Sequence, residues 1–303
     1  MNKEILEEAE RLRASLDKPT AGGLSFSNAQ QPLVPSDPIS VEFHRLGPWF
    51  TQFSFKGKEY GGTNRYAGDA RVCDFFEWLD VEGSLVELAS FEAGHTLMLA
   101  ENPAIHSILG VDGRSYLIER ARFIKDLYGD KKMSFELCDF ETEPLRRLGR
   151  FDVAFCSGLL YHLTEPWNFL REVATITDRF FLSTHYAVEE LESKGEYRGE
   201  TRPEYGYYEP CSGLKDHSFW LSLRSIWLAL RNAGFEITHQ RDLPDAAARL
   251  PEEVPPRDRP QRLVLPDLLL AHRSTPTSRR SGIQVFRPAK KAGGVLTLST
   301  LNT

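Results

Sequence analysis

Short apolar runs alternate with amphipathic segments through the middle of the 303-residue chain. The apolar runs predict β-strands at Leu85–Ala89, Ser107–Val111, Ser134–Cys138, Phe151–Cys156 and Arg179–Ser183. The segments between them carry apolar residues at helical spacing near His95–Glu101, Ser115–Leu127, Thr142–Leu148 and Pro166–Ala174. Alternating strands and helices imply right-handed crossovers, so the pattern predicts an α/β fold with a mainly parallel, doubly wound sheet.

The flanking segments extend this pattern at both ends. Before it, the sequence predicts a helix over Lys3–Leu16, a loop rich in turn formers, a strand in "PWFTQFSF" and a helix in "RYAGDARVCDFFEWL". After it, we expect a helix in "FWLSLRSIWLALRNAGF", a strand in "EITHQRDL" and, beyond the Pro-rich segment Pro244–Pro260, a strand in "LPDLLLAHRS". This order predicts a seven-stranded sheet closed by an antiparallel edge hairpin.

Composition narrows the class of protein. A net charge of −6 argues against a general nucleic-acid binder, although no acidic residue follows Asp267 and six basic residues do, namely Arg273, Arg279, Arg280, Arg287, Lys290 and Lys291. The four cysteines form no CxxC pair, and Cys138 and Cys156 lie in apolar runs typical of buried thiols. With a charged N-terminal segment and no stretch of ~18 apolar residues, we expect a cytoplasmic protein that does not enter the membrane.

Four features fall at the predicted strand ends, where open α/β sheets bind ligands. They are "VELASFEAGHT" after the first strand, "GVDGRS" after the second, "ELCDFE" after the third and "FCSGLLYHLTEP" after the fourth. An acid at one strand end is commonly a turn residue. Acids after two successive strands, together with turns at strands one and four, favour a nucleoside-binding site.

At these positions the chain resembles the class I S-adenosylmethionine-dependent methyltransferases, from about Ser84 to Tyr186 and more loosely to the final strands. Within that superfamily, "FDVAFCSGLLYHLTEP" is similar to the branch that includes the carboxy-S-adenosylmethionine-dependent transferase of tRNA wobble uridine. The first motif of the family reads acid-x-Gly-x-Gly-x-Gly. Its positions here are assigned to Glu87, Ala89, Phe91 and Gly94, so two glycines are replaced.

The resemblance implies S-adenosylmethionine as the cofactor and assigns roles at each strand end. Glu87 and the loop of Ala89, Phe91, Gly94 and His95 would contact its methionine part, and Asp112, followed by Gly113, would accept bonds from the two ribose hydroxyls. The remaining cofactor-binding candidates follow strands three and four, facing the adenine and the sulfonium respectively: Asp139, Phe140, Ser157 and Gly158.

His162 is the candidate general base, because it follows strand four where the acceptor should enter and imidazole titrates near neutral pH. The alternative is a histidine that caps a short helix. Tyr161 would line the pocket, and His185 is a second polar candidate after strand five. The spacing of these histidines and His217 matches no metal motif, so no metal is expected.

The predicted organisation is an N-terminal extension (1–80: helix, loop, helix) covering the cofactor site, a methyltransferase core (81–273) with a lid insertion at about 187–217, and a basic tail (274–303). We expect methyl transfer to a small-molecule acceptor, by O-methylation in a biosynthetic pathway. The alternatives are a tRNA-modifying (carboxy)methyltransferase, which the basic tail would suit, and a non-catalytic methyltransferase-fold subunit. A homodimer is left open.

Overall fold

The computed structural model describes residues 37–240 and 281–286. The chain divides into residues 1–41 and residues 42–303, and the sheets and the cavity considered below belong to the second unit. The first described helix is α2 (Pro38–Leu46). The predicted helix at Lys3–Leu16 and the predicted strand in "LPDLLLAHRS" lie outside the described residues.

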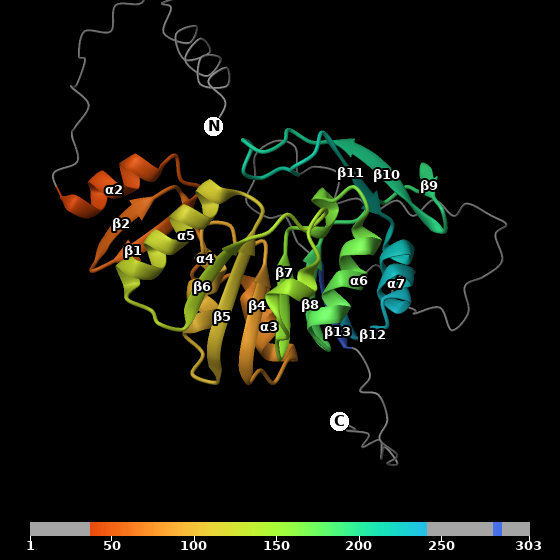
Figure 1. Ribbon diagram of the computed structural model, residues 1–303, viewed down its shortest axis with the longest axis horizontal. Coiled ribbons are helices and arrows are strands. Elements are labelled where there is room, and N and C mark those ends of the chain that lie inside the picture. The colour runs from red at the N-terminus through yellow and green to blue at the C-terminus, as the bar shows by residue number, and fades with distance from the viewer. Residues whose placement is uncertain (1–36, 241–280, 287–303) are drawn as a thin grey trace, which may run out of the picture. The chain divides into compact units, whose positions relative to one another are not determined.

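The main sheet has the order β12-β13-β8-β7-β4-β5-β6 (Figure 1). Its strands are β4 (Gly83–Leu88), β5 (Ile105–Asp112), β6 (Met133–Leu137), β7 (Val153–Ser157), β8 (Arg179–Thr184), β12 (Glu236–Gln240) and β13 (Ser281–Phe286). β4 through β8 pair in parallel, whereas β13 is antiparallel to both β8 and β12. The predicted α/β class with a mainly parallel sheet is confirmed. The chain order reverses between β4 and β7, which opens a crevice at their carboxyl ends.

Helices cover both faces of this sheet, which explains why its strands read as continuous apolar runs. Val86 and Cys156 face the cluster that includes the buried side chains of α6 (Pro166–Ile176) and α7 (Leu223–Asn232), which lie side by side. On the opposite face, Phe155 and Phe181 stack with ring centroids 5.2 Å apart, and Phe75 of α3 (Ala70–Trp78) packs edge-on against both. The other helices are α4 (Gly94–Ala100) and α5 (Ser115–Tyr128).

Two small sheets flank the main one. β1 (Thr51–Phe55), β2 (Lys58–Gly61) and β3 (Asn64–Arg65) form the first, and β9 (Glu192–Lys194), β10 (Tyr197–Pro203) and β11 (His217–Leu221) form the second. Figure 1 shows them near opposite ends of the main sheet, with β1 and β2 beside α5 and with β9–β11 above α6 and α7. The segment predicted as a lid insertion thus contains regular structure.

Three predicted elements differ from the structure. The helix expected at Thr142–Leu148 is a single 3₁₀ turn, η1 (Leu145–Leu148), which follows Pro144 and ends at Gly149, whose φ is 94°. The helix expected from Phe219 begins only at Leu223, since Phe219 and Leu221 are buried in β11 and Ser222 caps α7. The segment assigned to a basic tail contains β13, whose residues complete the main sheet between β8 and β12.

Two further predictions can be compared with the described residues. Cys138 and Cys156 are buried free thiols as expected, and burial raises the pKa of Cys138 to about 11. None of the helices in the described ranges is long and apolar enough to cross a membrane.

Candidate active site

A cavity lies where β4, β5, β6 and β7 end, and it collects most of the predicted site residues. Those that line it are Ala89, Phe91, Gly94, His95, Asp112, Gly113, Asp139, Phe140, Ser157, Gly158, Tyr161 and His162. Glu87 and His185 are not among its lining residues. The cavity is also lined by residues that the sequence analysis did not predict, chiefly Arg71, Arg114 and the loop from Pro210 to Leu214.

The loop after β4 keeps a left-handed backbone without glycine. Ala89 (φ 67°), Phe91 (φ 53°) and Ala93 (φ 67°) all have positive φ. The third left-handed position is therefore Ala93, not the Gly94 assigned from the motif. Each such residue costs roughly 1–2 kcal/mol relative to a right-handed conformation. Strain of this kind persists where surrounding contacts determine the backbone, and it clusters at ligand sites.

Gly94 is required for a different reason, namely the close approach of a ring. A Cβ on Gly94 would lie 2.7 Å from ring carbons of Tyr66 and 3.2 Å from the methyl group of Thr51. Any side chain here would displace Tyr66, which lines the cavity and packs edge-on against His95. The absence of a side chain at Gly94 therefore allows the segment before β4 to pack against the start of α4.

Asp112 holds the strained loop from the neighbouring strand. Its carboxylate accepts the backbone N–H of Phe91 (3.2 Å) and that of Arg114 (2.9 Å), one on each oxygen. Burial raises the pKa of Asp112 to about 6, against the opposing effects of the Arg114 charge and these hydrogen bonds. The side chain still lines the cavity, so a buried, largely ionised acceptor faces any ligand near neutral pH.

Glu87 lies beneath the loop, not in the cavity wall. It is 1% exposed and accepts a hydrogen bond from the Thr96 hydroxyl. Burial raises its pKa to about 8, so the carboxyl is largely protonated near neutral pH. His95 lies beside it, with Nδ1 3.8 Å from Oε1 of Glu87 and Nε2 3.3 Å from Oδ2 of Asp69.

Arg71 brings a positive charge to the same end of the cavity. Asp69 caps α3 and pairs with the Arg71 guanidinium, whose Nη1 donates to Oγ of Ser157 at 3.0 Å. Burial works to raise the pKa of Asp69, but hydrogen bonds from Arg71 and His95 outweigh it and hold that pKa well below its usual range. Asp69 is therefore ionised, and the guanidinium lies beside the turn after β7.

The loop of Ala89–Ala93 is anchored to the segment before β1 through Glu92. This carboxylate is 0% exposed and accepts the backbone N–H groups of Phe50 and Thr51, the latter at 2.7 Å. It also pairs with Arg120 of α5, whose Nη1 is 2.8 Å away and whose Nε donates to the Leu46 carbonyl. A buried charge is thus satisfied by partners from two separate segments, Phe50–Thr51 and α5.

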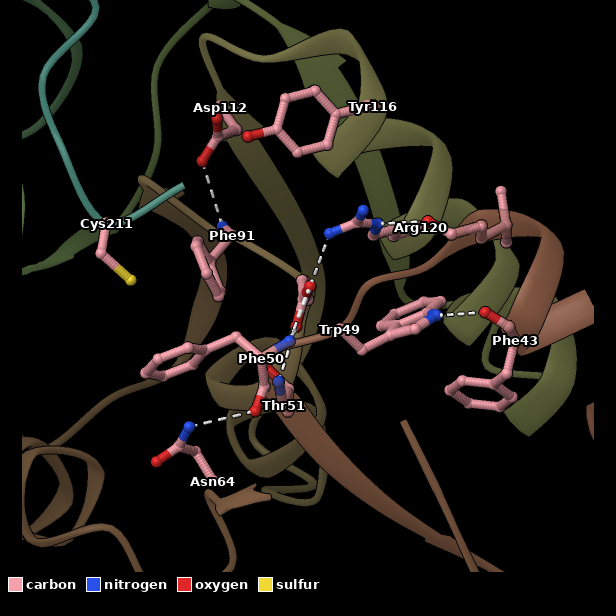
Figure 2. Close-up of polar contacts among 12 residues, drawn as sticks. Phe43, Trp49, Phe50, Thr51, Asn64, Phe91, Asp112, Tyr116, Arg120 and Cys211 are labelled. Carbon is pink, nitrogen blue, oxygen red and sulfur yellow. Dashed lines mark hydrogen bonds and ion pairs between the residues drawn. The ribbon is translucent and has the colours of Figure 1, made fainter. Parts of the chain in front are cut away.

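Figure 2 shows the surroundings of the ion pair between Glu92 and Arg120. The Arg120 guanidinium lies 5.4 Å from the ring centroid of Trp49 and 5.0 Å from that of Tyr116. The Phe50 and Phe91 rings meet edge-on, with centroids 5.7 Å apart, and both line the cavity. The anchored turn therefore presents Phe50 to the same cavity as the loop itself.

On the far side of the cavity, His162 is held by a carboxylate. Its Nδ1 lies 2.9 Å from Oε1 of Glu204, and its side chain is 17% exposed. Burial opposes ionisation of Glu204, but hydrogen bonds from His162, Ser212 and Gly213 lower its pKa to about 2. No local pattern points to Glu204, because it lies 42 residues from His162 along the chain.

His185 lies behind the cavity wall in an aromatic cluster. Its ring stacks on Trp220 with centroids 5.7 Å apart and meets Tyr161 edge-on at 4.6 Å. Tyr161 in turn contacts His162, with centroids 4.1 Å apart. The cluster fixes the rings of Tyr161 and His162. The Tyr161 ring lies between His185 and the cavity.

Arg114 ties the loop that carries Ser212 to the end of β5. Its guanidinium donates to the carbonyl oxygens of Gly206, Tyr207, Glu209 and Ser212. The Tyr207 hydroxyl also accepts the backbone N–H of Ser115. The side chain of Arg114 thus binds the loop, whereas its backbone N–H binds Asp112.

Within the described ranges, no group of three or more His, Cys, Asp or Glu side chains is arranged to hold a metal ion. The chemistry that the cavity offers therefore rests on buried carboxylates, a guanidinium, a carboxylate-bound imidazole and aromatic walls.

Residues 84–213 match a family model described as a methyltransferase domain. The N-terminal domain of EvdMO1, crystallised with SAH and D-fucose, is 29% identical over 82% of this chain and 95% of that one, with a TM-score of 0.63. The same domain with SAH bound is 28% identical, with the same coverage and a TM-score of 0.62. The chain is an S-adenosylmethionine-dependent methyltransferase. SAH is the demethylated product of S-adenosylmethionine, which is the cofactor.

Two further comparisons set the extent of this similarity. The complete EvdMO1 chain is 26% identical with a TM-score of 0.53, and the similarity covers 82% of this methyltransferase but 46% of that longer chain. No curated protein matches the sequence.

Proposed function

We propose that this methyltransferase transfers the methyl group of S-adenosylmethionine to a hydroxyl group of a small, sugar-like acceptor, with His162 as the general base. One observation carries the proposal: an imidazole in the cavity wall has its Nδ1 held by a carboxylate. With the Nδ1 proton donated to Glu204, Nε2 is the ring nitrogen that can accept a proton. A hydroxyl group becomes a better nucleophile as its proton is removed.

The residues of the cavity fit the cofactor. Each Asp112 oxygen takes one backbone N–H and retains further acceptor capacity, which suits the two ribose hydroxyls. Asp139 and Phe140 would flank the adenine. Arg71, beside Ser157, supplies a cation for the methionine carboxylate. The left-handed backbone at Ala89 to Ala93 brings main-chain groups close to the ligand, a role usually filled by glycine.

When bound, S-adenosylmethionine supplies an electrophilic methyl group for in-line displacement. The protein contributes alignment, worth up to ~7–11 kcal/mol in ideal cases. Tyr161 and His185 fix the His162 ring by packing, and Nε2 of His162 accepts the hydroxyl proton. Residues 204–214 act as the lid, and the segment around Phe50 and Tyr66 covers the opposite side.

The choice of acceptor draws on the relative. The domain of EvdMO1 was crystallised in the presence of D-fucose, a small polyhydroxyl compound. The acidic net charge of −6 also favours an uncharged acceptor over a polyanion. The tRNA alternative rested on the resemblance to the wobble-uridine branch and on a basic tail, and residues 281–286 of that tail segment are a strand of the main sheet.

The test is methyl transfer itself. Wild-type protein is incubated with S-adenosylmethionine and D-fucose or related sugars, and SAH release and the methylated sugar are measured by mass spectrometry. His162→Ala should lower turnover by about 10²–10⁴-fold with SAH affinity nearly intact. His217→Ala is the matched control, since His217 lies on β11 outside the cavity lining. Normal turnover by His162→Ala would refute the base.

A further inference from the structure

We propose that Glu204 is a positioning residue that holds the His162 imidazole in its proton-accepting tautomer. The inference rests on the proposed role of His162 as base, and it goes beyond that role because Glu204 acts on the tautomer and does not touch the acceptor. It follows from how the two carboxylate oxygens of Glu204 are used.

The two oxygens of Glu204 have separate partners. Oε1 meets Nδ1 of His162 at 2.9 Å, whereas Oε2 accepts the Ser212 hydroxyl and the Gly213 backbone N–H, the latter at 2.6 Å. The Ser212 hydroxyl itself accepts the backbone N–H of Tyr205 at 2.8 Å, so its own proton is directed to Glu204. A carboxylate accepts at every position, so all three groups donate and Nδ1 carries a proton.

A neutral amide of the same shape would reverse this arrangement. Two donors, from Ser212 and Gly213, meet at Oε2, so the oxygen of a glutamine should occupy that position. Its NH₂ group would then point at Nδ1 of His162, which could only accept. The imidazole proton would move to Nε2, and the ring would face the cavity as a donor. Glu204→Gln is therefore expected to disable the base without removing any atom of His162.

The backbone around Glu204 is fixed from both sides. Its N–H donates to the Asp216 carbonyl at 2.8 Å, and the Arg114 guanidinium binds the Ser212 carbonyl. Hydrogen bonds thus run from Asp112, through Arg114 and Ser212, to Glu204 and His162. The proposed ribose site and the base share one connected framework, which favours a built site over a chance contact.

The tautomer can be read directly in the full chain. With ¹⁵N-labelled histidine, long-range ¹H–¹⁵N spectra at pH about 8, where free imidazole is neutral, show which ring nitrogen carries the proton. His162→Ala assigns the signal. We expect the proton on Nδ1 in the wild type and on Nε2 in Glu204→Gln. A wild-type proton on Nε2, or the same tautomer in both proteins, would overturn the proposal, and the wild-type result alone suffices if the variant does not fold.

Turnover separates this inference from the proposed function. Glu204→Gln should lower kcat by about 10²–10⁴-fold, leave the Kd for SAH within about twofold, and add no further loss to His162→Ala. Glu200→Gln, which lies four residues before Glu204 on β10 and is paired with Arg202, is the matched control and should be neutral. If His162→Ala is inactive but Glu204→Gln is active, only this inference fails. If His162→Ala is fully active, the proposed base fails.

Discussion

Removing the charge of Glu92 tests whether the loop after β4 depends on the segment before β1. Glu92→Gln keeps the shape but leaves the Arg120 guanidinium, whose side chain is 7% exposed, without its carboxylate. Breaking a buried ion pair on one side typically costs about 3–5 kcal/mol, because the remaining charge stays desolvated. Two backbone N–H groups, of Phe50 and Thr51, also lose a charged acceptor.

Urea unfolding of the purified protein measures this loss. With a slope of about 3 kcal/mol per molar urea, the midpoint should fall by roughly 1–1.7 M. Glu42→Gln is the matched control. Its pair with Arg45 has exposed fractions of 35% and 55%, so solvent screens the pair and the urea midpoint should not change measurably.

A double-mutant cycle then isolates the pair. Glu92→Gln combined with Arg120→Met removes both charges, and the loss should be smaller than the sum of the two single losses. A loss below 1 kcal/mol for Glu92→Gln, or strictly additive losses, would refute the reasoning that this buried pair fixes the turn.

Three further predictions concern residues in or beside the loop after β4. Asp112→Ala should weaken SAH binding at least tenfold in calorimetry, and wild-type affinity should fall below pH about 6 as the carboxylate protonates. If the variant has the same Kd for SAH as the wild type, Asp112 only stabilises the turn and does not bind the cofactor. For Glu87, burial raises the pKa in the folded protein to about 8 from an ordinary value near 4.5, so its contribution to stability is fully present below pH about 4.5 and is lost as pH rises through 8. Glu87→Gln should remove that decline, by at most about 5 kcal/mol, and a decline that persists in melting curves would contradict the assignment. Ala93→Gly should relieve the left-handed strain and cost no stability, whereas Ala121→Gly in α5 should cost about 1 kcal/mol or more.

The sheet could be predicted because its central parallel strands β4, β7 and β8 are buried on both faces, and each therefore reads as an apolar run. Asp112, Asp139 and Ser157 could be found for a related reason, since parallel strands all end at one edge of the sheet. The left-handed residues could not be read from the glycine pattern. The loop holds this conformation because the backbone N–H groups of Ser90 and Phe91 donate to the Val111 carbonyl and the Asp112 carboxylate on another strand.

Residues whose roles depend on distant partners were missed. Arg71 meets Ser157 across 86 residues of chain, and Glu92 meets Arg120 across 28. Neither contact has a local pattern, because each is made by the tertiary fold. Glu204 follows the end of β10, and its partners His162 and Ser212 come from two different loops.

The place of β13 in the main sheet bears on the order in which the molecule can be assembled. Its residues 281–286 pair with β8, about 100 positions earlier, and with β12 on the other side. During synthesis, β8 keeps an open edge until residue 286 has left the ribosome, and contacts of such long sequence separation form slowly. A chain that ends before Ser281 would leave that edge unpaired, as a template for association with other chains. Completion of the sheet therefore depends on residues that are made about 100 positions after β8.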